Sequence, residues 1–289
     1  MFNKQGKFYK NLKKFKLLNS KKNTRKLSNL LPGICCIDIG ASYYEHSVWT
    51  VFLNSKNTLW LSFEPNENNM FYKKYWNWNA KLQSINCAIG EKKAIEEFYV
   101  TNIQGGSSLK KINISEDNKY RFDTNYFFPY ETKKIKTELL ENILNEKKIN
   151  LPIIIKLDTQ GSELDIIKSC KKLITEKKIV AFEVESSLLK IPNYEKSSKF
   201  NELSIFLESK GYELINIKIH KNNYKKSNIP VECDAVFSLS YSEISKLNID
   251  YKIALVAVYQ SYELYQEINN LSKMDKSVFE FLTKNNLIF

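Results

Sequence analysis

Short apolar runs alternate along the chain with segments whose apolar residues recur at helical spacing. The first run, Ile34–Ile39, is almost continuously apolar and leads into Asp-Ile-Gly, which is typical of a strand buried on both faces. Comparable runs later in the chain predict further strands. The predicted strands are Ile34–Ile39, Leu59–Phe63, Leu82–Ile89, Ile95–Val100, Lys133–Thr137, Ile153–Leu157, Ile179–Val184, Tyr212–Ile219 and Val231–Leu239.

Helical spacing separates most of these strands. It is found in residues 45–53, after residue 66, in Ser162–Leu173 and in Phe200–Ser209, and Ile244–Phe289 predicts two more helices. The last two strands follow one another without a helix between them and therefore predict an antiparallel pair. Five β-α units and this terminal hairpin predict a Rossmann-like α/β fold, whose mainly parallel sheet is covered by helices on both faces.

The net charge of +12 originates at one end of the chain. Residues 1–31 hold ten Lys or Arg and no acidic residue, whereas the rest of the chain holds 34 basic and 32 acidic residues. We therefore divide the chain into a basic N-terminal tail (1–31), a Rossmann-like domain (32–241) and a helical C-terminal extension (242–289). Apolar side chains interleave with the lysines of the tail, which would suit a basic amphipathic helix on a membrane surface or a nucleic-acid contact. We favour a solvated, partly disordered terminus.

Few residues suit metal or disulfide chemistry. The five cysteines are odd in number and include no Cys-x-x-Cys pair, and His46 and His220 are the only histidines. We expect a reduced, cytoplasmic protein without disulfides, structural zinc or another metal site. The longest apolar runs fall far short of the ~20 residues that span a bilayer, and the basic N-terminus lacks the apolar segment of a secretory signal.

Acidic residues and a glycine stand where the predicted parallel strands end. Asp38 and Gly40 close the first strand, and Glu64 follows the second, 26 residues after Asp38. Ligands of open parallel sheets bind beyond the carboxyl ends of the strands. A glycine at such an end lets a ligand approach the backbone closely, and a carboxylate there can accept hydrogen bonds from both ribose hydroxyls. We therefore expect a nucleoside site.

The loop after the first strand disfavours a dinucleotide. Pyrophosphate needs a glycine-rich turn and an open helix N-terminus, whereas Gly40 is followed by Ala-Ser-Tyr-Tyr-Glu without a second glycine. A nicotinamide-dependent oxidoreductase is therefore disfavoured. A ligand with a ribose and no phosphate fits better, and the cationic sulfonium of S-adenosylmethionine suits a site that contains Asp38 and Asp158.

These positions belong to a longer series of motifs. The series is Ile37-Asp38-Ile39-Gly40-Ala41, Phe63-Glu64-Pro65-Asn66, Ala88-Ile89-Gly90, Gly106-Ser107-Ser108-Leu109, Ile155-Lys156-Leu157-Asp158-Thr159-Gln160-Gly161-Ser162-Glu163, Phe182-Glu183-Val184-Glu185 and Cys233-Asp234-Ala235-Val236-Phe237. In this order the motifs resemble the FkbM family of S-adenosylmethionine-dependent methyltransferases, over residues 34–240, and Asp-x-Gln-Gly-x-Glu is the most specific of them. One position departs from the family: Tyr44 stands where another glycine is usual.

The resemblance implies the class I methyltransferase fold, a mainly parallel seven-stranded sheet that ends in an antiparallel hairpin. It also implies S-adenosylmethionine as the cofactor. By this resemblance Asp38, Gly40 and Ala41 would line the methionine portion of the cofactor, and Asp158 would lie beside the transferred methyl group. Glu64 would hold the ribose with Pro65 and Asn66 at its approach, and Ala88 and Ile89 would border the adenine.

Methyl transfer to a hydroxyl requires a group that accepts its proton, and a carboxylate within reach can do so. Asp158 and Glu163 are the candidate catalytic residues, with Gln160 orienting. The alternative for Glu163 is a favourable interaction with the N-terminus of its helix, and we leave both interpretations open. Of Glu183 and Glu185 we expect at most one to face the site.

Several other residues have plain structural explanations. A lone histidine on a first helix is more often a surface or packing residue, so we do not favour a catalytic role for His46. Ser107 and Ser108 follow two glycines, and without the resemblance they would indicate a flexible turn. For the aromatic residues we favour core packing over a sugar-stacking surface. They are Phe71, Tyr72, Tyr75, Trp76 and Trp78.

We expect an O-methyltransferase whose acceptor is a small molecule or a glycan, with a sugar or glycan-linked hydroxyl as the first class to try. This choice of acceptor comes from family analogy. The alternative is a non-catalytic Rossmann-like binding module whose basic tail contacts nucleic acid or a membrane. Because Asp38, Glu64 and Asp158 are all present, we favour the enzyme and do not expect a nucleic-acid partner. The oligomeric state stays open.

Overall fold

The computed structural model describes residues 21–42, 47–66, 78–115, 129–221 and 228–287. Its centre is a seven-stranded sheet in the order β3-β2-β1-β7-β8-β10-β9. The strands are β1 (Ile34–Ile39), β2 (Thr58–Phe63), β3 (Lys81–Ile85), β7 (Ile153–Leu157), β8 (Ile179–Ser187), β9 (Tyr212–Lys221) and β10 (Pro230–Leu239). Only β10 runs antiparallel to its neighbours β8 and β9. The predicted mainly parallel sheet with a terminal antiparallel hairpin is therefore confirmed.

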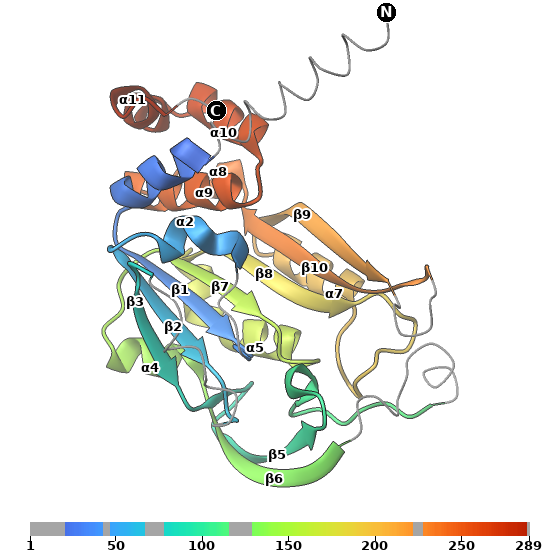
Figure 1. Ribbon diagram of the computed structural model, residues 1–289. Coiled ribbons are helices and arrows are strands. Elements are labelled where there is room, and N and C mark those ends of the chain that lie inside the picture. Colours follow the sequence, from blue (N-terminus) through green and yellow to red (C-terminus); the bar gives the residue numbers. More distant parts are fainter. Residues whose placement is uncertain (1–20, 43–46, 67–77, 116–128, 222–227, 288–289) are drawn as a thin grey trace, which may run out of the picture.

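A second, smaller sheet lies below the carboxyl ends of β1 and β2 (Figure 1). It has the order β4-β6-β5, with β4 (Ala88–Ile89), β5 (Ala94–Thr101) and β6 (Pro129–Glu138). The prediction of one strand over Leu82–Ile89 is wrong, because β3 ends at Ile85 and β4 joins the small sheet. The Asn86 side chain donates hydrogen bonds to the carbonyls of Glu64 and Pro65, both at 3.2 Å, and so holds the crossing between the two sheets.

Helices cover both faces of the large sheet, as predicted (Figure 1). On one face lie η1 (Ser47–Trp49), α2 (Thr50–Leu53) and α9 (Ile249–Ser261), and on the other α4 (Leu140–Glu146), α5 (Glu163–Ser169), α6 (Lys171–Thr175) and α7 (Phe200–Glu208). The single helix predicted over Ser162–Leu173 is broken at Cys170. The Ser169 hydroxyl and the Cys170 thiol both donate to the Ile166 carbonyl, and the Cys170 N–H bonds to Ile167 instead.

The chain beyond β10 forms more helices than predicted. After α8 (Tyr241–Ile244) come α9, α10 (Tyr265–Met274) and α11 (Lys276–Lys284), so the expectation of two helices over Ile244–Phe289 is wrong. One break falls at Glu263, whose φ is 58°, and the next at Asp275, which accepts hydrogen bonds from the N–H groups of Ser277 and Val278. Neither break contains the Gly or Pro that marks most helix ends in a sequence.

Both ends of the described chain belong to the main core. Nine of the thirteen residues of α9 are buried, which is typical of a helix packed on all sides. Residues 21–30 are helical, and Leu27 and Leu31 are fully buried in the same core. The expected solvated tail therefore does not extend over residues 21–31, while residues 1–20 lie outside the described parts. The division into tail, domain and extension stays a prediction.

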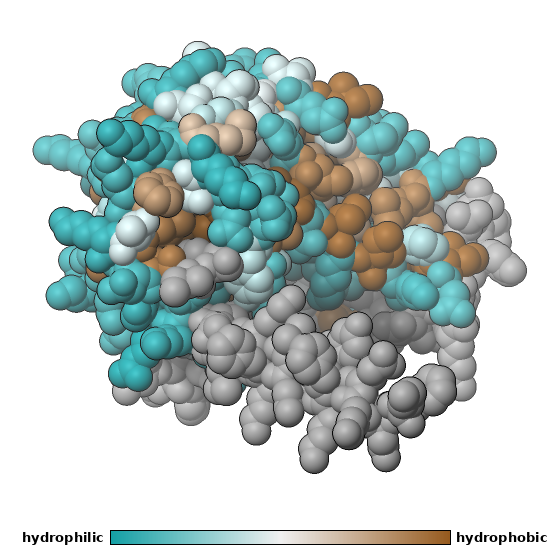
Figure 2. All heavy atoms as spheres, turned by 90° about the horizontal axis from the view of Figure 1, so that it is seen from above, coloured by the Kyte–Doolittle hydropathy of each residue, from teal (hydrophilic) through white to brown (hydrophobic). Residues whose placement is uncertain are grey.

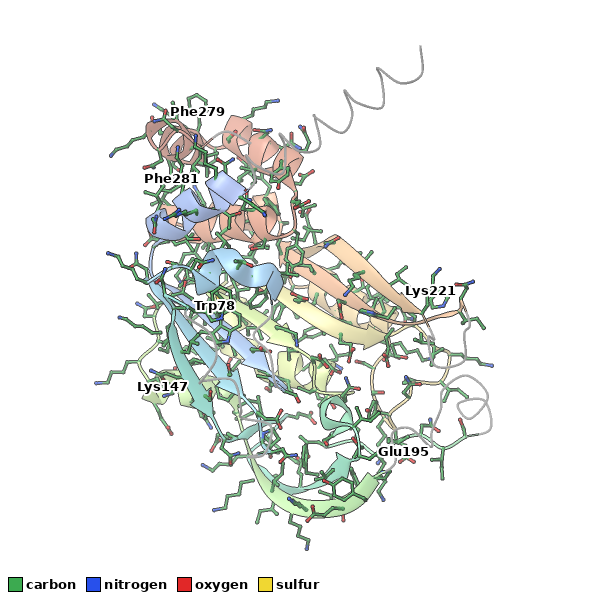
Figure 3. The ribbon with its side chains drawn as sticks, in the orientation of Figure 1. Trp78, Lys147, Glu195, Lys221, Phe279 and Phe281 are labelled. Atoms are coloured by element: carbon green, nitrogen blue, oxygen red, sulfur yellow. The ribbon has the colours of Figure 1, made fainter. Side chains whose placement is uncertain are left out.

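Trp78 packs against the core beside α2 and the β2–β3 side of the sheet (Figure 3). It is the one member of the predicted aromatic cluster within the described residues, and its packing agrees with the structural interpretation. The other four members lie outside them. None of the helices in the described ranges has the length and apolarity that a membrane crossing requires.

Apolar side chains gather at the end of the molecule formed by β9 and β10 (Figure 2). Leu214, Ile217, Ile219 and Ile229 are exposed there. Because β9 is an edge strand, its backbone could pair with another chain. Lys218 and Lys221 interrupt the apolar positions of β9, and such lysines oppose pairing at sheet edges.

Candidate active site

A pocket opens where β1, β2 and β7 end, and the small sheet closes it on one side. It brings together six of the residues predicted to bind the cofactor: Gly40, Glu64, Pro65, Ala88, Ile89 and Asp158. The other lining residues are Ile39, Ser42, Phe63, Cys87, Phe98, Gly105, Ser107, Ser108, Leu109, Thr159 and Ser162. Asp38 and Ala41 line an adjoining opening that shares Gly40, Ser42, Gly105 and Asp158 with the pocket.

Gly40 is required by the approach of the neighbouring strand. Its φ is +80°, and a Cβ added to it would lie 1.8 Å from the carbonyl oxygen of Asp158. Such a position tolerates no side chain. The glycine therefore lets β1 and β7 approach each other where both strands end, and close approach of a ligand to its backbone stays a prediction.

Glu64 is a buried carboxylate at the end of β2, only 6% exposed. The Asn66 N–H donates a hydrogen bond to its Oε1 at 2.8 Å, which gives Asn66 a role in orienting the carboxylate. Burial raises the pKa of Glu64 to about 7, and the nearby charges of Asp38 and Asp158 add to the rise against the effect of Asn66. A carboxylate in this state gains from any ligand that donates hydrogen bonds to it.

Two aspartates flank one lysine at the adjoining opening. The Lys156 Nζ lies 3.3 Å from Asp158 Oδ2 and 3.6 Å from Asp38 Oδ1. Parallel pairing causes this, because Asp38 of β1 is the register partner of Lys156 of β7. Burial alone would raise the pKa of Asp158, but Lys156 and the surrounding hydrogen bonds hold it below its ordinary value.

Gln160 orients Asp158, as predicted from the motif, and it also contacts a second acid. Its Nε2 donates to Asp158 Oδ1 at 2.9 Å and to Glu185 Oε2 at 2.6 Å. Gln160 and Gly161 have φ values of 59° and 113°, so the loop turns sharply between β7 and α5. Burial and the charge of Asp158 raise the pKa of Glu185 well above its ordinary value.

Glu163 stabilises this loop by accepting hydrogen bonds from the loop's own residues. Its Oε1 accepts hydrogen bonds from the Thr159 N–H (2.8 Å) and hydroxyl (2.9 Å), and the Gly161 N–H lies 3.0 Å from both of its oxygens. Ser108 fastens the loop from the other side, because its hydroxyl donates to the Gln160 carbonyl at 2.8 Å. These contacts favour a structural role for Glu163 over that of a general base.

Glu183 and Glu185 point to the same side of β8, because residues two apart on a strand do so, and Glu185 contacts Gln160. Neither lines the pocket or the adjoining opening, so the expectation that at most one would face the site stays a prediction. Glu183 is the register partner of Lys156, and it accepts a hydrogen bond from the Tyr262 hydroxyl. The Tyr262 hydroxyl in turn accepts a hydrogen bond from Trp49 Nε1 at 2.8 Å. Tyr262, which directly follows α9, is thereby linked to the register partner of Lys156.

Sequence reasoning missed the contributions of the small sheet and of Lys156. Phe98 of β5 and Cys87 add an apolar wall beside Ala88 and Ile89, and no local motif indicates that β5 folds against this pocket. Lys156 belongs to the motif that contains Asp158, but its position beside Asp38 follows only from the pairing of β1 with β7. Tyr44 and His46 lie outside the described residues.

The lining residues fit S-adenosylmethionine. The apolar residues of the pocket can border an adenine, Glu64 can accept hydrogen bonds from ribose hydroxyls, and the charged residues at the adjoining opening can bind an amino-acid end. No group of His, Cys, Asp or Glu side chains in the described ranges could hold a metal ion.

One of three comparisons with known proteins identifies the family of the chain. No curated protein matches the sequence significantly. A solved structure from Listeria monocytogenes, assigned as an S-adenosylmethionine-dependent methyltransferase, covers 78% of this chain and 99% of its own at 11% identity and a TM-score of 0.38, values too low to inform on activity. The model of the methyltransferase FkbM domain matches residues 38–214, more than half of the chain and all of the β1–β8 part of the site. The chain belongs to the FkbM methyltransferase family.

Proposed function

We propose that the protein is an S-adenosylmethionine-dependent methyltransferase that acts on oxygen. The observation that carries the proposal is the buried Glu64 carboxylate, which lines one pocket together with apolar residues and Asp158. A ribose, a purine and a charged amino-acid end together match these three parts. The sequence that follows Gly40 has no second glycine for a pyrophosphate-binding turn, which disfavours a dinucleotide.

The chemistry is the displacement of a methyl group from a sulfonium by an acceptor hydroxyl. The cofactor supplies the activated methyl group, so the protein's task is mainly to align the acceptor. Asp158 is the group that we place beside the acceptor, and Gln160 fixes its direction. Because its pKa is held low, Asp158 is a weak base at neutral pH. Orientation of the hydroxyl is therefore the larger part of its contribution.

For the acceptor we propose a sugar or glycan-linked hydroxyl on a small molecule or glycan. Carboxylates and amides such as Asp158, Gln160 and Glu185 pair well with hydroxyl groups, which supports this class. The buried or half-buried free cysteines suit a reducing compartment, so we place the protein in the cytoplasm.

The test is calorimetric titration of the full chain with S-adenosylhomocysteine. We expect binding in the micromolar range or tighter, and a Glu64→Ala variant that binds at least ~10-fold more weakly, because the ribose hydroxyls lose a charged acceptor. Lys147→Ala is a matched surface control, since Lys147 is exposed and its side chain donates a hydrogen bond to Gln83 at 3.2 Å. Absence of binding to the wild-type protein would refute the proposal.

A further inference from the structure

Lys156 occupies an unusual position for a lysine. It lies on β7 with only 16% of its side chain exposed, between Asp38 of β1 and Glu183 of β8 in the parallel register. Its side chain lines the opening beside Gly40, Ala41 and Ser42. A buried ammonium is costly unless it is paired, and here it is paired on both sides. It nevertheless keeps a surface that reaches the opening next to the cofactor pocket.

The charges of Lys156 and its neighbours are complementary to those of the methionine portion of S-adenosylmethionine. Asp38 and Asp158 contribute two negative charges and Lys156 one positive charge. The methionine end of S-adenosylmethionine carries a sulfonium, an ammonium and a carboxylate, which are two positive charges and one negative. An ammonium has three N–H donors. Asp158 accepts from one at 3.3 Å, and Asp38 lies at ion-pair distance, 3.6 Å, so a donor is left for a ligand carboxylate.

Neighbouring carboxylates keep the Lys156 side chain positively charged. Burial lowers the pKa of Lys156, but the carboxylates of Asp158, Asp38, Glu183 and Glu185 raise it above its ordinary value overall. Glu183 is itself fixed by the hydroxyl of Tyr262, which Trp49 holds at 2.8 Å. The ammonium is therefore in place before any ligand arrives.

We propose that Lys156 binds the α-carboxylate of the cofactor's methionine portion and so selects S-adenosylmethionine over analogues that lack this carboxylate. The inference rests on the proposed function. Without Lys156 the opening would hold two carboxylates and would favour a ligand end with two positive charges. The lysine thus sets which cofactor-like molecules the pocket accepts.

The experiment compares two ligands that differ only in the carboxylate: S-adenosylmethionine and its decarboxylated form. Calorimetry on the full-length wild-type protein should show at least ~10-fold tighter binding of the carboxylated ligand, since a hydrogen bond between charged groups contributes that much. In Lys156→Met this preference should disappear or reverse. Glu64→Ala is the matched control and should weaken both ligands by a similar factor, because it acts on the ribose.

The possible outcomes distinguish failure of the proposed function from failure of the role proposed for Lys156. If the wild-type protein binds neither ligand, the proposed function fails. If it binds both equally, Lys156 does not recognise the carboxylate, whatever the variants show. If Lys156→Met weakens both ligands equally while its thermal unfolding stays cooperative, Lys156 only positions Asp158 and the inference is overturned. Lys156→Gln, which keeps a neutral donor, replaces Lys156→Met if the latter does not fold.

Discussion

Glu64 shows how a single buried group can link stability, ligand binding and pH. Its pKa is raised from 4.5 to about 7, so the folded protein holds this proton more tightly than the unfolded chain does. Ionised Glu64 therefore lowers the free energy of unfolding. This effect is complete above pH 7 and decreases to zero as the pH falls toward 4.5. A ligand that donates two hydroxyl hydrogen bonds needs the ionised form, so binding and stability favour opposite protonation states.

Glu64→Gln should be more stable than the wild-type protein above pH 7 by about 3 kcal/mol, and the difference should vanish near pH 4.5. Chemical unfolding at several pH values measures it. For the wild-type protein, S-adenosylhomocysteine affinity should increase from pH 6 to pH 8, whereas Glu64→Gln should bind weakly with little dependence on pH. Equal pH dependence in the two proteins would show that another group controls binding.

Gly40 gives a second prediction at the residue scale. Gly40→Ala places a methyl group 1.8 Å from the Asp158 carbonyl at a φ of +80°, so β1 and β7 must separate. We expect a loss of roughly 2–4 kcal/mol in the free energy of unfolding, together with weaker cofactor binding. Gly105→Ala is the control, because a Cβ there meets nothing within 4 Å. Similar thermal unfolding of the two variants would contradict the close approach of the strands.

At the scale of elements, strand ends were the most predictable feature. The bounds of β1 coincide with the run Ile34–Ile39, because all six positions of this strand are buried and all but Asp38 are apolar. The split between β3 and β4 could not be predicted, since it depends on Asn86 reaching the backbone at Glu64 and Pro65, over twenty residues away in sequence. The hydrogen bonds of Glu163 could not be predicted either, because its partners are the N–H groups and the Thr159 hydroxyl of its own loop.

The loop from Asp158 to Glu163 provides a test of that role. Glu163→Ala removes the acceptor of the Thr159 and Gly161 hydrogen bonds and should cost about 2–4 kcal/mol of stability. Because the loop carries Asp158 and Gln160, S-adenosylhomocysteine affinity should fall in parallel. Thermal unfolding and calorimetry measure the two effects. A general base would behave differently: the variant would keep its stability and affinity and lose only turnover.

At the scale of the whole molecule, Tyr262 connects the C-terminal helices to Glu183, the register partner of Lys156. The family motif ends before these helices, so no resemblance indicated the contact, and the apolar pattern of α9 showed burial without a partner. Residues from η1, α9 and β8 meet in the hydrogen bonds of Trp49, Tyr262 and Glu183. The face of the sheet that carries Lys156 is thereby covered by residues from distant parts of the chain.

Tyr262→Phe should lower the free energy of unfolding by about 1–3 kcal/mol, because it removes one buried hydrogen bond to a carboxylate and one from an indole. Tyr241→Phe is the matched control, since the Tyr241 hydroxyl donates to the Met274 carbonyl at an exposed site and should cost less than about 1 kcal/mol. Chemical unfolding compares the two. Equal losses would indicate that the Trp49–Tyr262–Glu183 contact adds no particular stability.

The helix over residues 21–30 packs beside the last helices of the chain, and this has a consequence for biosynthesis. Thr24 accepts a hydrogen bond from Gln260, and Lys26 donates to the carbonyl of Asn286, contacts that span 236 and 260 positions. At translation rates of about 5–20 residues per second, Thr24 and Lys26 are synthesised roughly 10–50 s before these partners. During that interval an apolar, lysine-rich helix face is exposed on the nascent chain. The docking of this helix can therefore be completed only after the C-terminal helices have been synthesised.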